Sequence, residues 1–131
     1  MATIKKKFIG DKQFGGFTPY GNVTTIRATL QTNATGAALN SDSAAAIGIG
    51  DVVVLEKLPE GFLLEDAQVI VSTPMTASAT GSLGFIYADG VDSTDVPQDA
   101  AYFGTGLNAA TAGRIRTSST KAPVRLANCV T

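Results

Sequence analysis

The sequence feature that most constrains the fold is a run of three short apolar segments between Gly50 and Gly90. The segments cover residues 52–55, 62–72 and 82–88, and each is followed by a turn signal that contains Gly or Pro. Valine, isoleucine, phenylalanine and tyrosine dominate them, which is the composition of β-strands bounded by turns. We therefore predict a three-strand antiparallel meander that forms the hydrophobic half of a β-sandwich.

The middle segment shows the alternation expected of a strand. Ala67, Val69 and Val71 share one face, since side chains two positions apart point the same way. A helix over residues 62–71 is the alternative. It is less favourable, because Val69, Ile70 and Val71 are three consecutive β-branched residues.

These patterns predict an all-β fold, a single antiparallel β-sandwich of jelly-roll type. The predicted strands are residues 23–30, 51–56, 62–72 and 82–88. The residues expected to be largely buried are Ile26, Val53, Leu55, Val69, Val71, Leu83 and Phe85. Truncation of Val69 or Phe85 to alanine is then expected to cost about 2–4 kcal/mol of stability.

Elsewhere the signals are weaker. Residues 37–49 are rich in Ala and Gly, and a loop with a short final strand or one helical turn capped by Ser41-Asp42-Ser43 fits them. Residues 90–102 are acidic and contain Pro97, which predicts a loop with one optional helical turn at residues 97–101. Residues 103–113 resemble a further loop, and residues 115–124 a weak strand.

Composition narrows the class of protein. The chain has 131 residues, enough for one domain, and its 16% charged residues lie below the roughly 25% typical of soluble domains. The net charge of −1 predicts no general affinity for nucleic acid. The single Cys129 excludes an internal disulfide framework and is expected to be a buried free thiol. No apolar run reaches the ~20 residues of a membrane helix, and no signal peptide is evident, so synthesis in a cytoplasm is expected.

The charges are unevenly distributed. Basic residues dominate before residue 31 and after residue 102, whereas ten acidic residues and one lysine lie between those positions. Basic ends that flank an acidic centre are suited to head-to-tail contacts between copies, or to docking on another charged surface. Solvated loops of a stable fold are the simpler interpretation, and both stay open.

The N-terminal segment is predicted to be separate from the body. Residues 1–21 are interpreted as an extended aromatic and basic arm, and residues 22–131 as the β-sandwich domain. Aromatic residues among glycines are poor at building a local core, so we expect the arm to lie across a neighbouring subunit and to become ordered there. The residues expected at that interface are Lys5, Lys6, Lys7, Phe8, Phe14, Phe17 and Tyr20. The alternative is an N-terminal strand that closes the sandwich, with Phe8 and Phe17 in its own core.

The sequence offers no strong cofactor or metal pattern. Residues 104–109 match the loose dinucleotide pattern G-x-G-x-x-A, but no buried strand precedes it and no acidic residue follows Asp99. With no His and one Cys, zinc and copper lack ligands. Asp89, Asp92, Asp95 and Asp99 lack the spacing of a calcium loop, which favours a solvated acidic loop.

Catalysis has no evident residues either. Without His there is no Ser-His or Cys-His pair. Glu65 and Asp66 are adjacent, so on a strand they would point to opposite faces and would not act together. We predict no catalytic, cofactor-binding or metal-binding residue, and we do not expect an enzyme.

The central region resembles small head proteins of tailed bacteriophages, over about a third of the chain. The residues that carry the resemblance are Gly50-Asp51, Leu58-Pro59-Glu60-Gly61, Glu65-Asp66-Ala67-Gln68-Val69, Ser82-Leu83-Gly84-Phe85 and Ala88-Asp89-Gly90. The resemblance implies a virion protein that decorates or cements the capsid shell, commonly with a jelly-roll or related β-sandwich fold.

The expected function is therefore that of a capsid decoration or cement subunit on the exterior of the phage head. Its expected partners are the major capsid protein and copies of itself, a dimer being preferred to a trimer, with no nucleic acid and no membrane. The alternative is a ligand- or carbohydrate-binding β-sandwich module. That alternative needs an exposed aromatic platform, whereas Trp is absent and Tyr20, Tyr87 and Tyr102 are scattered in the sequence.

Overall fold

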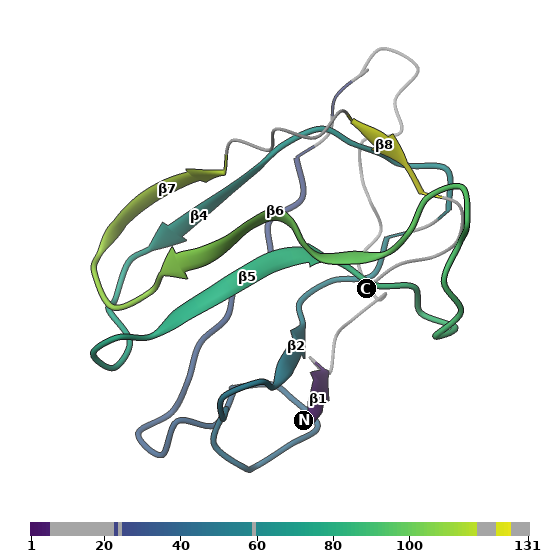
Figure 1. Cartoon of the computed structure of the whole chain (residues 1–131). Helices are drawn as coiled ribbons and strands as arrows, with labels where there is room; N and C mark the ends of the chain where they lie inside the picture. The colour runs from purple at the N-terminus through teal and green to yellow at the C-terminus, as the bar shows by residue number, and fades with distance from the viewer. Residues whose placement is uncertain (6–22, 24, 59, 118–122, 127–131) are drawn as a thin grey trace. The chain divides into compact units, whose positions relative to one another are not determined.

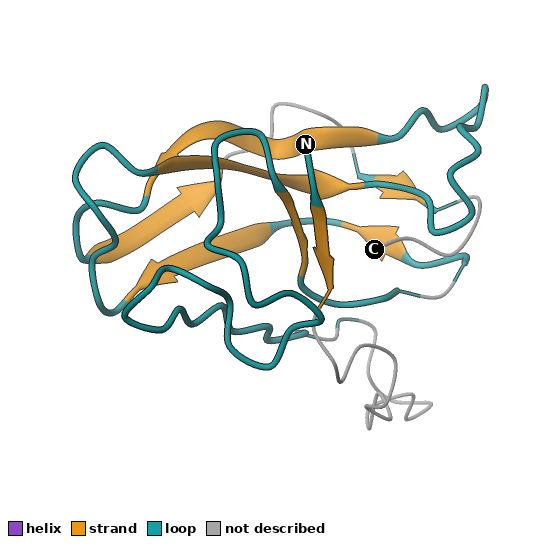
Figure 2. Cartoon of the chain, turned by 90° about the horizontal axis from the view of Figure 1, so that it is seen from below, coloured by secondary structure: helices purple, strands orange, loops and turns teal. Residues whose placement is uncertain are grey.

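The computed structural model describes residues 1–5, 23, 25–58, 60–117 and 123–126. These residues form strands and loops and contain no helix, which confirms the predicted all-β class for this part of the chain (Figures 1 and 2). The strands form four two-stranded ladders and no closed barrel among the described residues. Within the same residues, no helix has the length and apolarity to cross a membrane.

The chain divides into two compact units, here called unit 1 (Met1–Leu58) and unit 2 (Pro59–Val130). The division falls inside the range predicted as one sandwich domain, residues 22–131.

Unit 1 contains one short parallel ladder. Strand β1 (Thr3–Lys5) pairs with β2 (Val52–Val54) over three residue pairs. Ile4 and Val54 are 2% and 3% exposed. Parallel strands usually occur in larger, covered sheets, so this ladder depends on its surroundings within the unit.

Side-chain hydrogen bonds organise the long connection between β1 and β2. The Asn33 Oδ1 atom accepts bonds from the backbone N–H groups of Thr35 and Ala37 at 2.9 and 3.0 Å. The buried Ser41 hydroxyl donates to carbonyl oxygens of this loop. Two isolated bridges, Thr32 with Ala38 and Ala37 with Ala46, add backbone pairing to this loop. Asn and Ser favour such local bonds over regular structure, which explains a loop here in place of a helix.

Unit 2 contains three antiparallel ladders. They are β3 (Leu63–Leu64) with β8 (Val124–Arg125), β4 (Ala67–Val71) with β7 (Gly113–Thr117), and β5 (Thr80–Phe85) with β6 (Asp99–Asn108). The β4–β7 ladder is amphipathic, since its exposed and covered side chains alternate along both strands. The loop before β5 is tied to the β6–β7 connection, because Ala109 bonds through its backbone to Met75 and Ala79.

Four aromatic side chains form the centre of unit 2. Phe85, Tyr87, Tyr102 and Phe103 are between 2% and 9% exposed. Their rings meet edge to face, with centroids 5.9, 5.6 and 4.9 Å apart in the three contacting pairs. The Tyr87 hydroxyl donates to the carbonyl oxygen of Val96 at 2.6 Å, so its polar end is satisfied. Because Tyr102 and Phe103 are consecutive and both buried, β6 departs from regular strand alternation.

The departure coincides with a close approach of two backbones. The ladder register shifts between the pairs Leu83–Gly104 and Phe85–Asp99. Between them, a Cβ atom on Gly84 would lie 2.0 Å from the carbonyl oxygen of Asp99. Only glycine fits at this position, because the obstacle is backbone and cannot rotate away.

The predicted three-strand meander is wrong. Strands β2, β4 and β5 do not pair with one another, because β1, β7 and β6 respectively are their partners. The prediction failed because β6 lies in residues predicted to be loop. There Gly104 and Gly106, at φ 148° and 66°, hide the strand pattern.

Two other predicted strands, residues 23–30 and 62–72, differ from those in the structure. The described residues of 23–30 contain no strand, and Val23 is 72% exposed. Alternation alone is insufficient there, because a strand also needs a partner edge. The segment 62–72 is divided into β3 and β4 by Glu65 and Asp66, and the Asp66 carboxylate accepts the backbone N–H of Ala67. The helical turns considered at residues 41–46 and 97–101 are absent from the described residues.

The predicted core is confirmed for one residue in seven. Phe85 is buried at 3% exposure. The remaining six are only half-buried: Ile26, Val53, Leu55, Val69, Val71 and Leu83. Two-stranded ladders cover less of each side chain than the wide sheets that the prediction assumed. Buried apolar residues that it missed are Ile4, Ala37, Ala38, Val54, Tyr87, Tyr102, Phe103 and Leu126.

Candidate interaction surfaces

The predicted interface residues lie mostly outside the described part of the chain. Lys6, Lys7, Phe8, Phe14, Phe17 and Tyr20 are outside it, as is Cys129. Lys5 is the last residue of β1 and has an exposed side chain. Its backbone N–H donates to the Asp42 carboxylate and its carbonyl accepts from the Asp42 N–H, both at 2.9 Å. Residues 2–5 therefore belong to the folded unit 1.

One carboxylate organises the end of unit 1 where β1 begins. Asp51 Oδ1 accepts the backbone N–H of Ala2, and Oδ2 accepts that of Gly48, both at 2.8 Å. The neighbouring Val52 N–H donates to the Ala2 carbonyl at 2.8 Å. The bond from Ala2, and then that from Gly48, lowers the pKa of Asp51 below its usual value. Asp51 is therefore a charged clamp that joins the start of the chain to a turn some fifty residues later.

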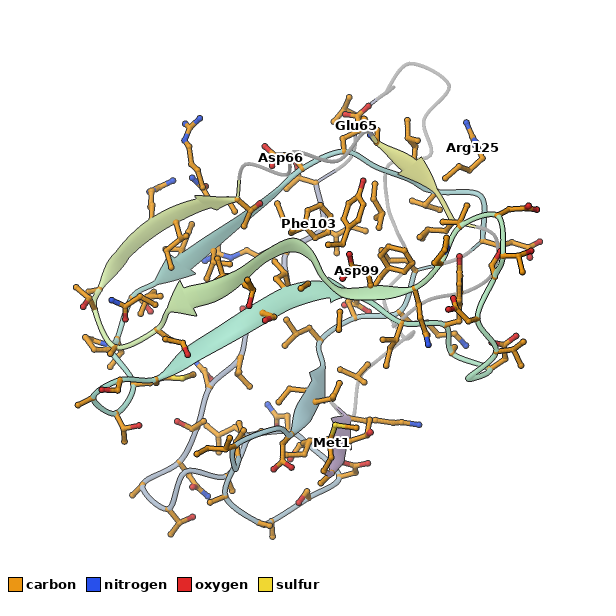
Figure 3. The ribbon with its side chains drawn as sticks, viewed as in Figure 1. Met1, Glu65, Asp66, Asp99, Phe103 and Arg125 are labelled. Carbon is orange, nitrogen blue, oxygen red and sulfur yellow. The ribbon has the colours of Figure 1, made fainter. Side chains whose placement is uncertain are left out.

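The clamp presents two apolar side chains to solvent. Met1 precedes Ala2, and Ile49 follows Gly48, so both lie next to residues that Asp51 holds. Met1 is 99% exposed, and Ile49 is as exposed as in an extended peptide, at 108%. Gly50 continues the turn with φ 84°. Figure 3 shows Met1 beside β1. We call Met1 and Ile49 the apolar tip, and it is a surface that a partner can cover.

A second surface lies on the outer side of the β4–β7 ladder. Gln68 is paired with Arg116, and Ile70 with Arg114, so the four side chains are neighbours on one face. All four are exposed, and Ile70 is 54% exposed. Arg114 donates to the Gln68 side chain at 3.4 Å, and neither arginine has an ion pair with a described residue. We call these four residues the basic face.

A third surface is the loop between β5 and β6. Asp89 accepts the backbone N–H of Val91 through its side chain, and Asp92 accepts those of Ser93 and Gln98, at 2.7–3.0 Å. These bonds give the loop a defined shape, as aspartates commonly do in turns. Val91 is 62% exposed. We call residues 89–95 the acidic loop.

Small-molecule binding has less support among the described residues. The tyrosines considered for an aromatic platform include Tyr87 and Tyr102, which lie in the buried cluster of unit 2. Tyr20 lies outside the described residues. The described residues contain no group of three or more His, Cys, Asp or Glu side chains that could hold a metal ion. No cofactor or metal ligand is assigned.

Two further sequence motifs, residues 104–109 and the pair Glu65 and Asp66, lie in the described part of the chain. The dinucleotide-like pattern at residues 104–109 begins in strand β6 and ends at Ala109, just beyond it, so it does not open a helix as that fingerprint requires. Glu65 and Asp66 lie between β3 and β4 (Figure 3), and both are exposed. The Asp66 carboxylate bonds to the backbone of Ala67 and lies 3.5 Å from the Thr117 hydroxyl. The bonds of Asp66 therefore stabilise the start of strand β4.

Comparison of the chain with protein-family models, with curated proteins and with solved structures finds no match.

Sequence reasoning missed the apolar tip and the basic face. The tip had a signal in Gly48-Ile49-Gly50-Asp51, where one large apolar residue lies between two glycines ahead of an aspartate. The basic face had a signal in Arg114-Ile115-Arg116, whose alternation places both arginines on one side of a strand. Neither segment shows its strand partner in the sequence.

Proposed function

We propose that the protein is a structural virion subunit that binds the major capsid protein on the outside of a tailed-phage head and stabilises the shell. The observation that carries the proposal is the apolar tip, where Met1 and Ile49 are fully exposed and each lies next to a residue that Asp51 holds. Burying an isoleucine side chain contributes about 1.5–3 kcal/mol. Because Ile49 is exposed in the free chain, this stabilisation is gained only when a partner covers its side chain.

Two further properties support a structural role over catalysis. Only 16% of the residues are charged. The described residues also include several exposed large apolar side chains, such as Ile49 and Val91. The segments that resemble phage head proteins include Gly50-Asp51, which forms part of the turn beneath the tip. The clamp residue is thus one of the residues on which the resemblance rests.

The proposal includes a finer architecture for unit 2. Its three antiparallel ladders are proposed to be parts of a jelly-roll β-sandwich. The amphipathic β4–β7 ladder supports this, since a sandwich buries one face of each sheet. The aromatic cluster on β5 and β6 is the matching apolar surface.

The arm is proposed to extend the contact. Because residues 3–5 form β1, the contact is proposed for residues 6–21 of the predicted arm. Its Phe8, Phe14, Phe17 and Tyr20 would each bury on the order of 150 Å² or more against the shell or a second copy. Deletion of residues 6–20, which leaves β1 intact, is expected to keep a folded body that binds heads far more weakly.

Binding to heads of the encoding phage, assembled without this protein, tests the proposal. The wild-type chain should sediment with heads at saturable stoichiometry, and Ile49→Ser should bind about tenfold more weakly, the loss expected for one buried aliphatic anchor. Val23→Ser is the matched control, because Val23 is an exposed aliphatic residue of unit 1 that the clamp does not hold. Absence of wild-type binding would refute the function, whereas equal binding of Ile49→Ser would remove the tip from it.

A further inference from the structure

Unit 2 carries two surfaces of opposite charge, each with one exposed aliphatic side chain. On the basic face Ile70 lies beside Arg114, with Arg116 and Gln68 as the next pair. On the acidic loop Val91 lies between Asp89 and Asp92. Ile70 is 54% exposed and Val91 is 62% exposed. Each surface thus has the anatomy of a small contact patch, an apolar centre inside a charged rim.

Within one chain, the charged side chains of the basic face and of the acidic loop, all in the described part of the chain, do not bond to each other. The described partner of Arg114 is Gln68, and those of Asp89 and Asp92 are backbone N–H groups of their own loop. In Figure 1 the β5–β6 connection lies at the right of unit 2, whereas β4 and β7 run toward its left end. Their charges are therefore available to another molecule.

We propose that the basic face of one copy binds the acidic loop of a second copy, with Ile70 against Val91 and Arg114 and Arg116 against the loop aspartates. This inference does not depend on capsid binding. Because the two surfaces differ, the contact is heterologous, and repetition produces rings or open chains of subunits. A second copy is the partner that the charges favour, because its acidic loop is complementary to the basic face, whereas unit 2 as a whole has seven acidic and four basic residues. A polyanion such as DNA would be repelled by that balance.

The order of the acidic loop supports its role as a ligand. Asp89 and Asp92 hold the loop through their Oδ1 atoms, which fixes the backbone around Val91 before binding. A preformed loop loses less conformational entropy on association than a flexible one. The strand that carries both arginines is likewise fixed by its ladder with β4.

Sedimentation velocity of the full chain tests the contact. At about 0.1 M salt the weight-average mass should rise with concentration, and at about 1 M it should fall toward the monomer, because the Debye length shrinks from about 10 Å to about 3 Å. The double variant Arg114→Glu/Arg116→Glu should associate at least about tenfold more weakly. The triple variant Asp89→Asn/Asp92→Asn/Asp95→Lys should do the same, while each asparagine keeps the Oδ1 acceptor that shapes the loop.

Mixing the variants distinguishes this contact from other modes of association. Each variant retains one functional surface, so neither should associate alone, and an equimolar mixture should form one-to-one pairs that do not grow. The matched controls Arg27→Glu and Glu60→Lys reverse exposed charges outside both surfaces and should leave association unchanged. Circular dichroism of every variant checks that the fold is retained.

Three results would overturn the inference. The first is a wild-type chain that stays monomeric at all concentrations in about 0.1 M salt. The second is association that both charge variants retain at wild-type strength. The third is binding of a fluorescent DNA duplex that Arg114→Glu/Arg116→Glu abolishes, which would assign the basic face to nucleic acid.

Discussion

Units 1 and 2 are stabilised by different kinds of interaction. In unit 1 the ladder has three residue pairs. The side-chain oxygens of Asp42 and Asp51 accept backbone bonds from β1 and its neighbour Ala2, and Asn33 accepts bonds within its own turn. Unit 2 has three antiparallel ladders and four buried aromatic side chains among its described residues. Unit 1 should therefore respond most to the loss of an acceptor or of its charge, and unit 2 to the loss of apolar volume.

The largest expected effect is on the aromatic cluster of unit 2. Phe85→Ala removes a ring that is 3% exposed and contacts both Tyr87 and Tyr102. The free energy of unfolding should fall by about 3–5 kcal/mol. Val69→Ala, at a half-buried position of β4, should lower it by no more than about 2 kcal/mol. Urea denaturation measures both, and equal losses would contradict the placement of the core at the aromatic cluster.

The next effect tests the close approach of β5 and β6. Gly84→Ala places a methyl group 2.0 Å from the Asp99 carbonyl oxygen, so the strands must separate. A loss of about 3 kcal/mol is expected. Gly81→Ala is the matched control on the same strand, because its Cβ would meet nothing within 4 Å. It should change the free energy of unfolding by no more than about 0.5 kcal/mol. Similar values for the two variants would contradict the packing of β6 over Gly84.

The fold class was predictable from the sequence, because local composition controls it. β-Branched and aromatic residues bounded by glycine and proline placed β2, β4 and β5 within a few residues of their observed limits. Pairing was not predictable from the same signals. The ladder from Leu83 to Gly104 and that from Val69 to Ile115 join distant residues, and nothing local specifies such partners.

The candidate surfaces were also not predictable, because they depend on contacts between residues that are distant in the sequence. Asp51 was predicted only as the first residue of the strand at 51–56, because its bond to Ala2 spans 49 positions and has no local signal. Gln68 and Ile70 join Arg114 and Arg116 on one face only because β4 pairs with β7, a pairing that the sequence does not show. The seven predicted interface residues came from composition, and Lys5 alone lies in the described chain, where it ends a strand.

A smaller effect is expected at Asn33 in unit 1. Asn33→Ala removes the oxygen that accepts the backbone N–H groups of Thr35 and Ala37 and the Thr35 hydroxyl. Loss of a turn-forming acceptor costs about 1 kcal/mol. Asn33→Asp keeps the acceptor and should retain most of that stability. Thermal unfolding of the two variants makes the comparison, and equal destabilisation would mean that the acceptor is not what holds this loop.

The smallest effect on the stability of the whole protein is expected for the Asp51 clamp, where the change is confined to two backbone amides. The backbone bonds from Ala2 and Gly48 lower its folded pKa below 3.8. The stability that it contributes is therefore present above the unfolded pKa and is lost as the pH falls through the lower, folded pKa. NMR titration from about pH 6 to about pH 2 should show the Ala2 and Gly48 amide resonances moving together, with a midpoint under 3.8.

The variant Asp51→Asn separates the two bonds of the clamp. Asparagine retains one oxygen acceptor for Ala2, but its amide nitrogen does not accept the Gly48 N–H. The Gly48 amide should exchange faster with solvent, the Ala2 amide should change less, and both should lose their acid titration. A midpoint at or above 3.8 in the wild type would contradict the clamp.

Hydrogen exchange on phage heads tests the central claim most directly, namely that unit 1 meets the shell through the apolar tip. Mass spectrometry of the chain, free and bound to heads assembled without it, compares the amides of residues 47–51 with those of strand β5. Binding should slow exchange at residues 47–51 and leave β5 (Thr80–Phe85) unchanged. Protection confined to unit 2, with residues 47–51 exchanging as in the free protein, would contradict the account.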